Sequence, residues 1–482
     1  MSQSWGSMAP VRQSHVLAYG ATAVAWTLIA ISLLRIPIQL SDSFTEFLAM
    51  QSESLWSVVR SELAGGPYFR PLRRALIKIL FDLSGGHYYY WFRGFHALEV
   101  LILFVLFVRM LRIHTRAGAA VVPLALAMVA GMHTFANVLR EAFPVNHFLT
   151  IAICCVAAVN LAQARASRAV DVGAILLLAF AMFTIESGLL VWVVFVTAYF
   201  VGYRGISRGA LLTLTGVFAA YFVIRFGVLE GGVPSFNERE TGFGLSSATP
   251  AEVQRIFGAN PWPFYLYNVV SAMSCVLFAE PRSGSWYFVK ALVEHDVWPW
   301  QVLTVLTSTL TTLVLIWYAV GRFNRWRRLD IDEDDRLVVL FIGLLPANAA
   351  FAAVYEKDVI LSVAGVFYCG AAAIVFRRLL IEVGSSSSTL SRTAAYAVAL
   401  VLACGWSLRF LSIEYRLREV ASIHRNDWAY YDAWEQKQAT VQLTTTAEKR
   451  VWQTLYDDAI WRIQAPPMID SRLAEAWSDP KE

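Results

Sequence analysis

Charged side chains are scarce in this sequence. Only 16% of its 482 residues are Asp, Glu, Lys or Arg, whereas 57% are hydrophobic, and the mean hydropathy is +0.51. A soluble domain carries about 25% charged residues, which it needs to cover its surface. The composition therefore excludes an ordinary soluble fold and predicts a protein whose excess apolar surface faces lipid.

The motifs of several soluble enzyme classes are also missing. The sequence has no Walker motif, no H-E-x-x-H, no G-x-S-x-G and no glycine-rich dinucleotide fingerprint. Its five cysteines fall in apolar segments without metal-ligand spacing, and its net charge of +4 includes no basic tract. These absences argue against soluble nucleotide chemistry, a disulfide framework and nucleic-acid binding.

Apolar runs of membrane-spanning length recur along the chain. A helix needs about 20 residues, at a rise of about 1.5 Å each, to cross the hydrocarbon core of a bilayer. The pattern predicts an all-α integral membrane protein with about eleven transmembrane helices. The predicted helices begin near Val16, Tyr90, Ala117, Asn146, Val170, Gly188, Ser207, Gln301, Leu337, Ile360 and Thr393.

Basic residues between the apolar runs predict the orientation. Cytoplasmic loops are enriched in Lys and Arg. With a cytoplasmic N terminus, every linker on the cytoplasmic side carries arginine, including residues 109–116 and 322–328. We therefore predict a cytoplasmic N terminus and a C terminus on the outer face. The default location is a bacterial inner membrane.

The same rule divides the chain into parts. Residues 1–413 are predicted to form the transmembrane domain, with outer-face loops at 39–89 and 229–300, and residues 414–482 a small helical tail outside. The apolar stretch 264–278 is predicted as a helix at, or dipping into, the outer face. Counting it as a span would place the following basic loop on the wrong side.

Two residues near the first span could carry chemistry at the predicted outer face. Asp42 is placed to act as a general base on a hydroxyl acceptor, or it is a loop residue or helix N-cap. Arg70 is kept extended by Pro71 and could point its guanidinium at a phosphate. The alternative for Arg70 is an ordinary helix start with proline in the first turn.

Polar groups also fall inside or at the ends of apolar runs. Arg93, His96 and Glu99 follow at three-residue spacing on one helix face, an expensive arrangement in a membrane unless they pair or line a cavity. His133 and Arg140, at the end of the third span, could bind an anionic group or cap a wet helix end.

Two later charged positions complete the candidates. Glu186 separates two apolar runs, so it lies either in a tight external turn or within the membrane, where a carboxylate suggests function. Lys357 lies in a short charged turn. It could neutralise a phosphate or simply pair with Glu356 and Asp358.

Several of these residues carry a resemblance to a known family. The run PYFRPL at 67–72, followed by a glycine pair, aromatic residues and FHAL at 95–98, resembles a segment of GT-C glycosyltransferases. The similarity is to the branch of protein O-mannosyltransferases and transmembrane-TPR mannosyltransferases. Further matches, in chain order, are Asp42, His133, Glu186, Tyr221 to Arg225 and residues 356–367.

The sequence also departs from the family pattern. Ser41 and Ser43 flank Asp42, where the family has a paired acidic motif, and Ile185 stands where a lysine is usual. Asn137 lies near the position of an expected acid, and Lys357 replaces a late arginine. These changes affect the acidic motifs more than the apolar framework.

The resemblance implies a GT-C-like bundle with amphipathic outer-face helices and an outer cavity. It implies transfer of a sugar from a polyprenyl-phosphate carrier in the bilayer to a glycan, lipid or protein acceptor, with inversion. Asp42 would take the acceptor proton, and Arg70, with Arg140 or Lys357, would stabilise the departing phosphate. No metal ligands are assigned, and a divalent cation is left open as a cofactor. The other implied substrate-binding residues are Arg93, His96, His133 and Glu186.

Two other functions stay open. The altered acidic motifs are compatible with a catalytically inactive GT-C-like scaffold or assembly protein. A transporter of a lipid-linked substrate would be expected to show inverted repeats, and the sequence shows none.

Overall fold

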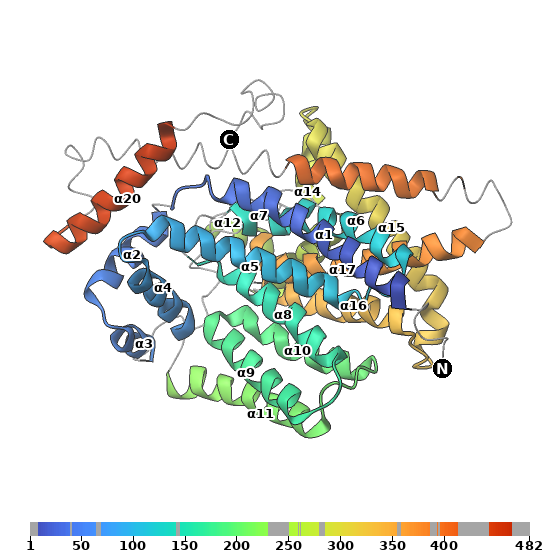
Figure 1. Cartoon of the computed structure of the whole chain (residues 1–482), viewed down its shortest axis with the longest axis horizontal. Helices are drawn as coiled ribbons and strands as arrows, with labels where there is room; N and C mark the ends of the chain where they lie inside the picture. Colours follow the sequence, from blue (N-terminus) through green and yellow to red (C-terminus); the bar gives the residue numbers. More distant parts are fainter. Residues whose placement is uncertain are drawn as a thin grey trace.

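The structure is a helical bundle. The computed structural model describes residues 8–38, 41–63, 69–140, 145–229, 250–258, 260, 262–278, 285–353, 358–385, 393, 396–412 and 443–464. Over these residues the regular elements are helices, without a strand, which confirms the predicted all-α class. Figure 1 shows the long helices lying lengthwise against one another.

Five helices in the described part of the chain are long and apolar enough to cross a membrane. These are α1 (Met8–Leu33), α5 (Tyr88–Met110), α11 (Arg208–Phe222) with the π-helical η2 (Val223–Val228), α15 (Pro299–Trp326), and η4 (Asp358–Leu361) with α17 (Ser362–Ser385). Other helices of the bundle, of 11 to 18 residues, are α6 (Arg116–Gly131), α8 (His147–Gln163), α9 (Arg168–Thr184), α10 (Leu190–Phe200), α16 (Glu333–Ala350) and Tyr396–Ser412. A multi-pass membrane protein fits these helices, and the total of eleven spans stays a prediction.

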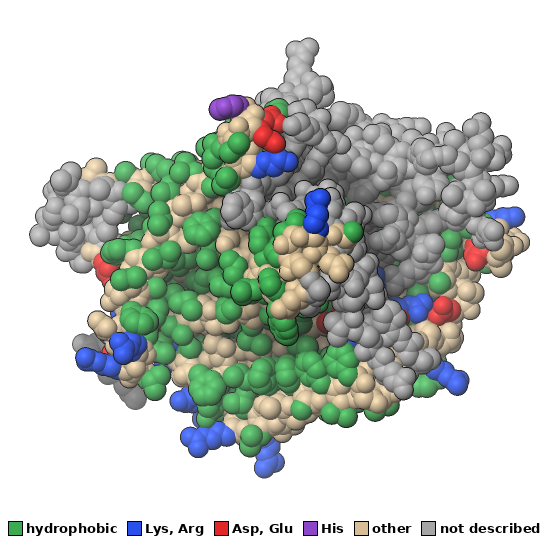
Figure 2. All heavy atoms as spheres, turned by 180° about the vertical axis from the view of Figure 1, so that it is seen from behind, with side chains coloured by type: hydrophobic (Ala, Val, Ile, Leu, Met, Phe, Trp, Pro, Cys, Tyr) green, Lys and Arg blue, Asp and Glu red, His purple; other side chains and the backbone are tan. Residues whose placement is uncertain are grey.

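The burial of these helices separates the core from a lipid-facing surface. The apolar window of α17 is 94% buried, and this helix packs against α6, α8, α15 and α16. The corresponding window of the span formed by α11 and η2 is only 17% buried. Figure 2 shows a broad hydrophobic surface, with Lys and Arg side chains mostly around its margin. Such a surface is stable only against lipid.

Four short helices form a second, smaller hydrophobic cluster at one end of the bundle. They are α2 (Ser41–Ser52), α3 (Leu55–Leu63), α4 (Pro71–Ser84) and α20 (Thr446–Gln464). Phe47 lies at the centre, with ring centroids of Phe81, Tyr88 and Phe92 within 5.2 Å. The tail helix α20 adds Val451, Leu455 and Ala459 to this cluster.

The bundle thus has two distinct ends (Figure 1). We call the end that carries α2, α3, α4 and α20 the α4 end. We call the end where α1 starts, and where α15 connects to α16, the N-terminal end.

The apolar stretch around residue 270 dips into the bundle. It forms α13 (Trp262–Phe278), between α12 (Pro250–Phe257) and α14 (Ser285–Val293), and it packs against α15 and α16. The Asn268 side-chain amide donates to the carbonyl of Ala353 at 2.7 Å. The helix packs within the bundle, and its predicted position at, or dipping into, the outer face stays a prediction.

Ion pairs connect the helices at the N-terminal end. Arg325 donates to both carboxylate oxygens of Asp332, at 2.9 and 3.1 Å, and Arg322 reaches the same carboxylate at 3.1 Å. On α17, Arg378 pairs with Asp334 at 2.5 Å. These pairs join α15 to the following loop and α16 to α17. The hydrogen bonds from Arg325 hold the pKa of Asp332 below its ordinary value of 3.8.

This pKa shift predicts a pH dependence of stability. A carboxyl group whose pKa is lower in the folded than in the unfolded state stabilises the fold above the unfolded pKa, and loses that effect as the pH falls through the folded pKa. The unfolding midpoint of wild type in detergent should therefore fall more steeply between about pH 5 and about pH 3 than that of Asp332→Asn. The exposed Asp457→Asn variant on α20 is the control. Parallel curves for wild type and Asp332→Asn would contradict the assignment.

Candidate functional site

Arg70 lies at the start of α4, where its backbone and its side chain serve different partners. Pro71 is the first helical residue, a position that suits proline because no N–H is needed there. The Arg70 backbone N–H donates to Glu62 at 3.1 Å. The predicted helix start is thus present, and the guanidinium points away from it toward the bundle.

An aromatic anchor sets the position of this segment. Phe69 is buried, and its ring contacts Phe183 of α9 at a centroid distance of 5.6 Å and Tyr221 of α11 at 6.3 Å. Burial of one aromatic side chain contributes roughly 1.5–3 kcal/mol. Phe69 therefore fixes the neighbouring Arg70 against the ends of α9 and α11.

At this point three charged side chains meet. Arg70 donates to Glu186 Oε2 through Nε at 3.0 Å and a terminal nitrogen at 2.8 Å. Arg225 donates to Glu186 Oε1 at 3.0 Å and to the Tyr221 hydroxyl at 2.9 Å. Two guanidiniums share one carboxylate, so this charge cluster of Arg70, Glu186 and Arg225 carries a net positive charge.

The local backbone explains the position of Glu186. The residue opens η1 (Glu186–Leu189), a short 3₁₀ turn between α9 and α10. A Cβ atom at Gly188 would lie 2.1 Å from the carbonyl oxygen of Ala181, so only glycine fits this close approach. The predicted tight turn is present, and its location at the outer face stays a prediction.

The charge cluster borders an exposed apolar surface. The side chains of Arg70 and Glu186 are about one-fifth exposed, and that of Arg225 is 7% exposed. Arg225 lies in the π-helical end of α11, where Val223 and Val228 are 65% and 68% exposed. π-Helical turns often occur at functional sites. A cationic site beside lipid-facing side chains suits an anionic headgroup that carries an apolar chain.

A second group of side chains has the composition of a metal site. His133 opens α7 (His133–Arg140), Cys275 lies on α13, and Asp358 opens η4. His133 Nε2 is 2.9 Å from Cys275 Sγ, which is 3.8 Å from Asp358 Oδ1. All three residues are buried, and their ligand atoms lie within 4.8 Å of one another.

These donors suit zinc better than a harder ion. Zinc accepts nitrogen, thiolate sulfur and carboxylate oxygen, and a catalytic site often has three protein ligands with a fourth position open. Magnesium and calcium prefer oxygen ligands alone. Without a metal, the same three side chains form a short hydrogen-bonded chain. The sequence predicts only His133 here, because the three ligands come from distant segments that share no spacing motif.

The predicted polar face of α5 joins helices together. Arg93 donates to the carbonyl of Pro37 at 2.9 Å, and Glu99 accepts from the Thr150 hydroxyl at 2.6 Å. His96 is buried nearby. These contacts connect α5 to the segment after α1 and to α8, which gives Arg93 and Glu99 a structural role in the packed core.

The side chains of three predicted residues lie outside the described part of the structure. Asp42 belongs to the first turn of α2 and Arg140 to the end of α7, but both side chains lie outside the described ones. Lys357 lies outside the described residues. The site therefore rests on Arg70, Glu186 and His133, which the sequence predicted, and on Arg225, Cys275 and Asp358.

One buried arginine escaped the sequence analysis. Arg409 donates to the Thr307 and Ser308 hydroxyls on α15 at 3.0 and 2.7 Å, and its guanidinium lies 4.0 Å from the Trp406 ring centroid. Its position in the last apolar run could have indicated a buried polar contact, because an arginine within such a run needs hydrogen-bond partners. The hydroxyl groups of α15 supply them.

Comparison with known proteins found no significant match. No protein-family model matches the chain, and no curated protein or solved structure matches it significantly. The resemblance to GT-C glycosyltransferases therefore rests on the sequence motifs alone and stays an expectation.

The charge cluster predicts a stability effect. Glu186→Gln leaves two guanidiniums with a weaker, neutral acceptor, so the free energy of unfolding should fall by about 1–3 kcal/mol. The measurement is the thermal unfolding midpoint of the full-length protein in one detergent. Glu294→Gln, in an exposed pair with Lys290, is the control and should change little. Equal shifts for the two variants would refute a special role for Glu186.

The group formed by His133, Cys275 and Asp358 predicts that the protein binds zinc. Full-length protein purified without chelators should retain zinc when measured by mass spectrometry of the metal. Cys275→Ser should weaken zinc affinity in a chelator competition by more than about a hundredfold, since even outer-shell changes cost up to that much. The exposed Cys404→Ser is the matched control. Protein free of zinc before and after incubation with the ion would rule out the site.

Proposed function

We propose that this protein is a membrane transferase of the GT-C type, which moves a sugar from a polyprenyl-phosphate carrier to an acceptor on the non-cytoplasmic face. The observation that carries the proposal is the charge cluster. Arg70, Glu186 and Arg225 come from three separate segments that resemble the family, and the fold brings them into direct contact. Arg70 and Glu186 are 116 residues apart in sequence.

The surroundings of the cluster favour a lipid-linked donor. A polyprenyl chain could lie against the exposed apolar side chains of η2, while its phosphate meets the net positive charge of Arg70 and Arg225. Planar guanidiniums bind phosphate oxygens in pairs, which fixes orientation as well as charge. A soluble donor would gain nothing from the adjoining apolar surface.

In this proposal, α2 supplies the residue that activates the acceptor. This helix packs against α4, whose start holds Arg70, so Asp42 belongs to the same group of short helices. In the proposed step, the acceptor hydroxyl oxygen bonds to the anomeric carbon as the bond from that carbon to the phosphate oxygen breaks. The hydroxyl proton passes to Asp42, and the bonding electron pair leaves with polyprenyl phosphate. Attack opposite the leaving group inverts the anomeric carbon.

The two arginines would act on the leaving group. Negative charge grows on the phosphate as the bond breaks, and preorganised cationic donors stabilise that charge. Glu186 holds both guanidiniums in place. A divalent cation, if used, would be held by His133, Cys275 and Asp358, and would supply positive charge for binding an anion.

The charge distribution supports an outward-facing α4 end. Arg109, Arg112, Arg322 and Arg378 lie at the N-terminal end, and basic residues favour the cytoplasmic side. The α4 end, with the tail helix α20, would then face the other side of a bacterial inner membrane.

A transfer assay tests the proposal. Membranes with equal amounts of wild type and variant protein are incubated with a panel of radiolabelled polyprenyl-phosphate hexoses, and label in glycan, lipid and protein fractions is counted. Asp42→Asn keeps the shape of the side chain and removes its basicity. Transfer should fall by about 10²–10⁴-fold, the usual effect of losing a general base.

A matched pair of arginine variants probes the cluster. Arg70→Lys keeps the positive charge but loses the paired donors of the guanidinium, so sugar transfer by this variant should fall below that of wild type. Arg74→Lys is the control, because Arg74 lies one turn further along α4 and pairs with Glu53 and Glu62. Transfer that is unchanged in both Asp42→Asn and Arg70→Lys would overturn the proposal.

One observation favours a second candidate, a catalytically inactive scaffold. Glu186 uses both of its oxygens on the two arginines, an arrangement that also serves to clamp the segment before α4 onto the bundle. For a scaffold, no panel member would be transferred by wild type, and Glu186→Gln would still lower stability.

A further inference from the structure

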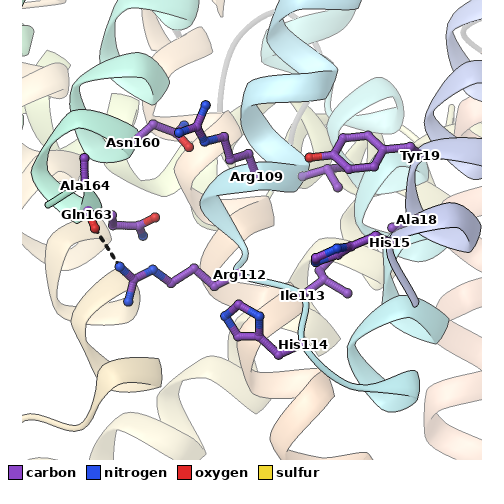
Figure 3. A pocket seen from close by; sticks show the side chains of 11 residues that line it. His15, Ala18, Tyr19, Arg109, Arg112, Ile113, His114, Asn160, Gln163 and Ala164 are labelled. Atoms are coloured by element: carbon purple, nitrogen blue, oxygen red, sulfur yellow. Dashed lines mark hydrogen bonds between the residues drawn. The ribbon is translucent and has the colours of Figure 1, made fainter. Parts of the chain in front are cut away.

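The N-terminal end contains a cavity that the proposed reaction does not use. Its volume is about 410 Å³, and it lies between the start of α1, the end of α5 and the end of α8. Figure 3 shows side chains from these segments placed around one opening. The lining residues with polar side chains are His15, Tyr19, Arg109, Arg112, His114, Asn160 and Gln163.

The cavity is cationic. Two arginines and two histidines line it, and no Asp or Glu is among its lining residues. Within the described part of the chain, the Arg109 guanidinium has no ion-pair or hydrogen-bond partner. An arginine that is free at the wall of a cavity without carboxylates is available to bind an anion.

The second arginine is held in a defined position. Arg112 follows the end of α5 with φ +49°, a left-handed conformation that is uncommon for a residue with a side chain. Its guanidinium donates to the carbonyl of Gln163 at 2.8 Å and forms an ion pair with Glu333, which is not among the residues that line the cavity. Such backbone outliers persist where the surrounding structure requires them, often at binding sites.

An unpaired hydrogen-bond acceptor in the cavity indicates that the ligand also carries a donor group. The Asn160 amide nitrogen donates to the carbonyls of Leu106 and Val156, at 3.0 and 2.9 Å. Its oxygen is buried and has no hydrogen-bond partner among the described residues. A ligand that places a hydroxyl group near its phosphate would satisfy Asn160 together with the arginines.

The cavity lies at the ends of two candidate membrane spans. The candidate span of α5 ends at Met110, one residue after Arg109, and that of α1 starts at Gln13, beside His15. Val16 and Leu17, which lie between the lining residues His15 and Ala18 in sequence, are more than 60% exposed. Acyl chains could therefore lie along α1 while the headgroup enters the cavity. Basic pockets between membrane helices on the cytoplasmic side are a known type of anionic-lipid site.

We propose that this cavity binds the phosphate of an anionic phospholipid with a hydroxylated headgroup, of the phosphatidylglycerol type, from the leaflet at the N-terminal end. Arg109 and Arg112 bind the phosphate, and Asn160 accepts from a headgroup hydroxyl. The site is independent of the transferase proposal, because it shares no residue with the charge cluster.

The test is a lipid-binding titration of the full-length protein. Native mass spectrometry follows the titration of protein in neutral detergent with phosphatidylglycerol or with phosphatidylcholine, and sn-glycerol 3-phosphate serves as the soluble source of the same chemistry. Wild type should bind phosphatidylglycerol more tightly than phosphatidylcholine. Arg109→Gln should weaken phosphatidylglycerol binding by about tenfold or more, the usual effect of losing a charge-assisted hydrogen bond.

Arg328→Gln provides the matched control. It removes the same charge from an exposed position at the same end of the bundle, away from the cavity. Because Arg109 is exposed and unpaired, its variant should fold as wild type, which the unfolding midpoint checks. Equal binding by the two variants, or equal binding of the two lipids by wild type, would overturn the proposal. Tight binding of glycerol phosphate alone would keep the phosphate site and assign it to a soluble ligand.

Discussion

A bilayer offers no water to polar groups, so each polar side chain inside this bundle must find its partner within the protein. Asn348 of α16 shows the principle. Its amide nitrogen donates to the carbonyl of Ile360, and its oxygen accepts from the backbone N–H of Ala364, both at 2.8 Å. These bonds satisfy backbone groups where η4 passes into α17, at the centre of the core. Arg409 meets the same requirement through the hydroxyl groups of α15.

The same constraint gives structural meaning to the charge cluster and to the charged network at the N-terminal end. In the charge cluster, charges of opposite sign come from segments far apart in sequence. In the N-terminal network, Arg322 and Arg325 lie within ten residues of Asp332. Each group joins helices at an end of the bundle. The interior between them contains hydroxyls, amides and few charges. Polar chemistry is thereby concentrated at the two ends, where a lipid headgroup and water are both within reach.

Much of the helical framework could be predicted from the sequence, because a span is a local property of about 20 consecutive residues. The start of α4 at Pro71 follows from the fixed φ of proline, and the turn at Glu186 follows from Gly188. The partners of these residues could not be predicted in the same way. His133 and Cys275 are 142 residues apart, and Cys275 and Asp358 are 83 apart, so no spacing rule connects them. The path of α13 decides that meeting, and this path depends on packing rather than on hydropathy.

The order of synthesis gives the tail helix a particular consequence. The ribosome completes α2, α3 and α4 early. The apolar face of these helices, around Phe47 of α2, is covered by α20, the last described element of the chain. Until Val451, Leu455 and Ala459 arrive, that face stays open to solvent or to a chaperone. The α4 end, which holds the candidate site, is therefore the last part of the molecule to mature. A chain that terminates early would carry every predicted span and still lack a finished α4 end.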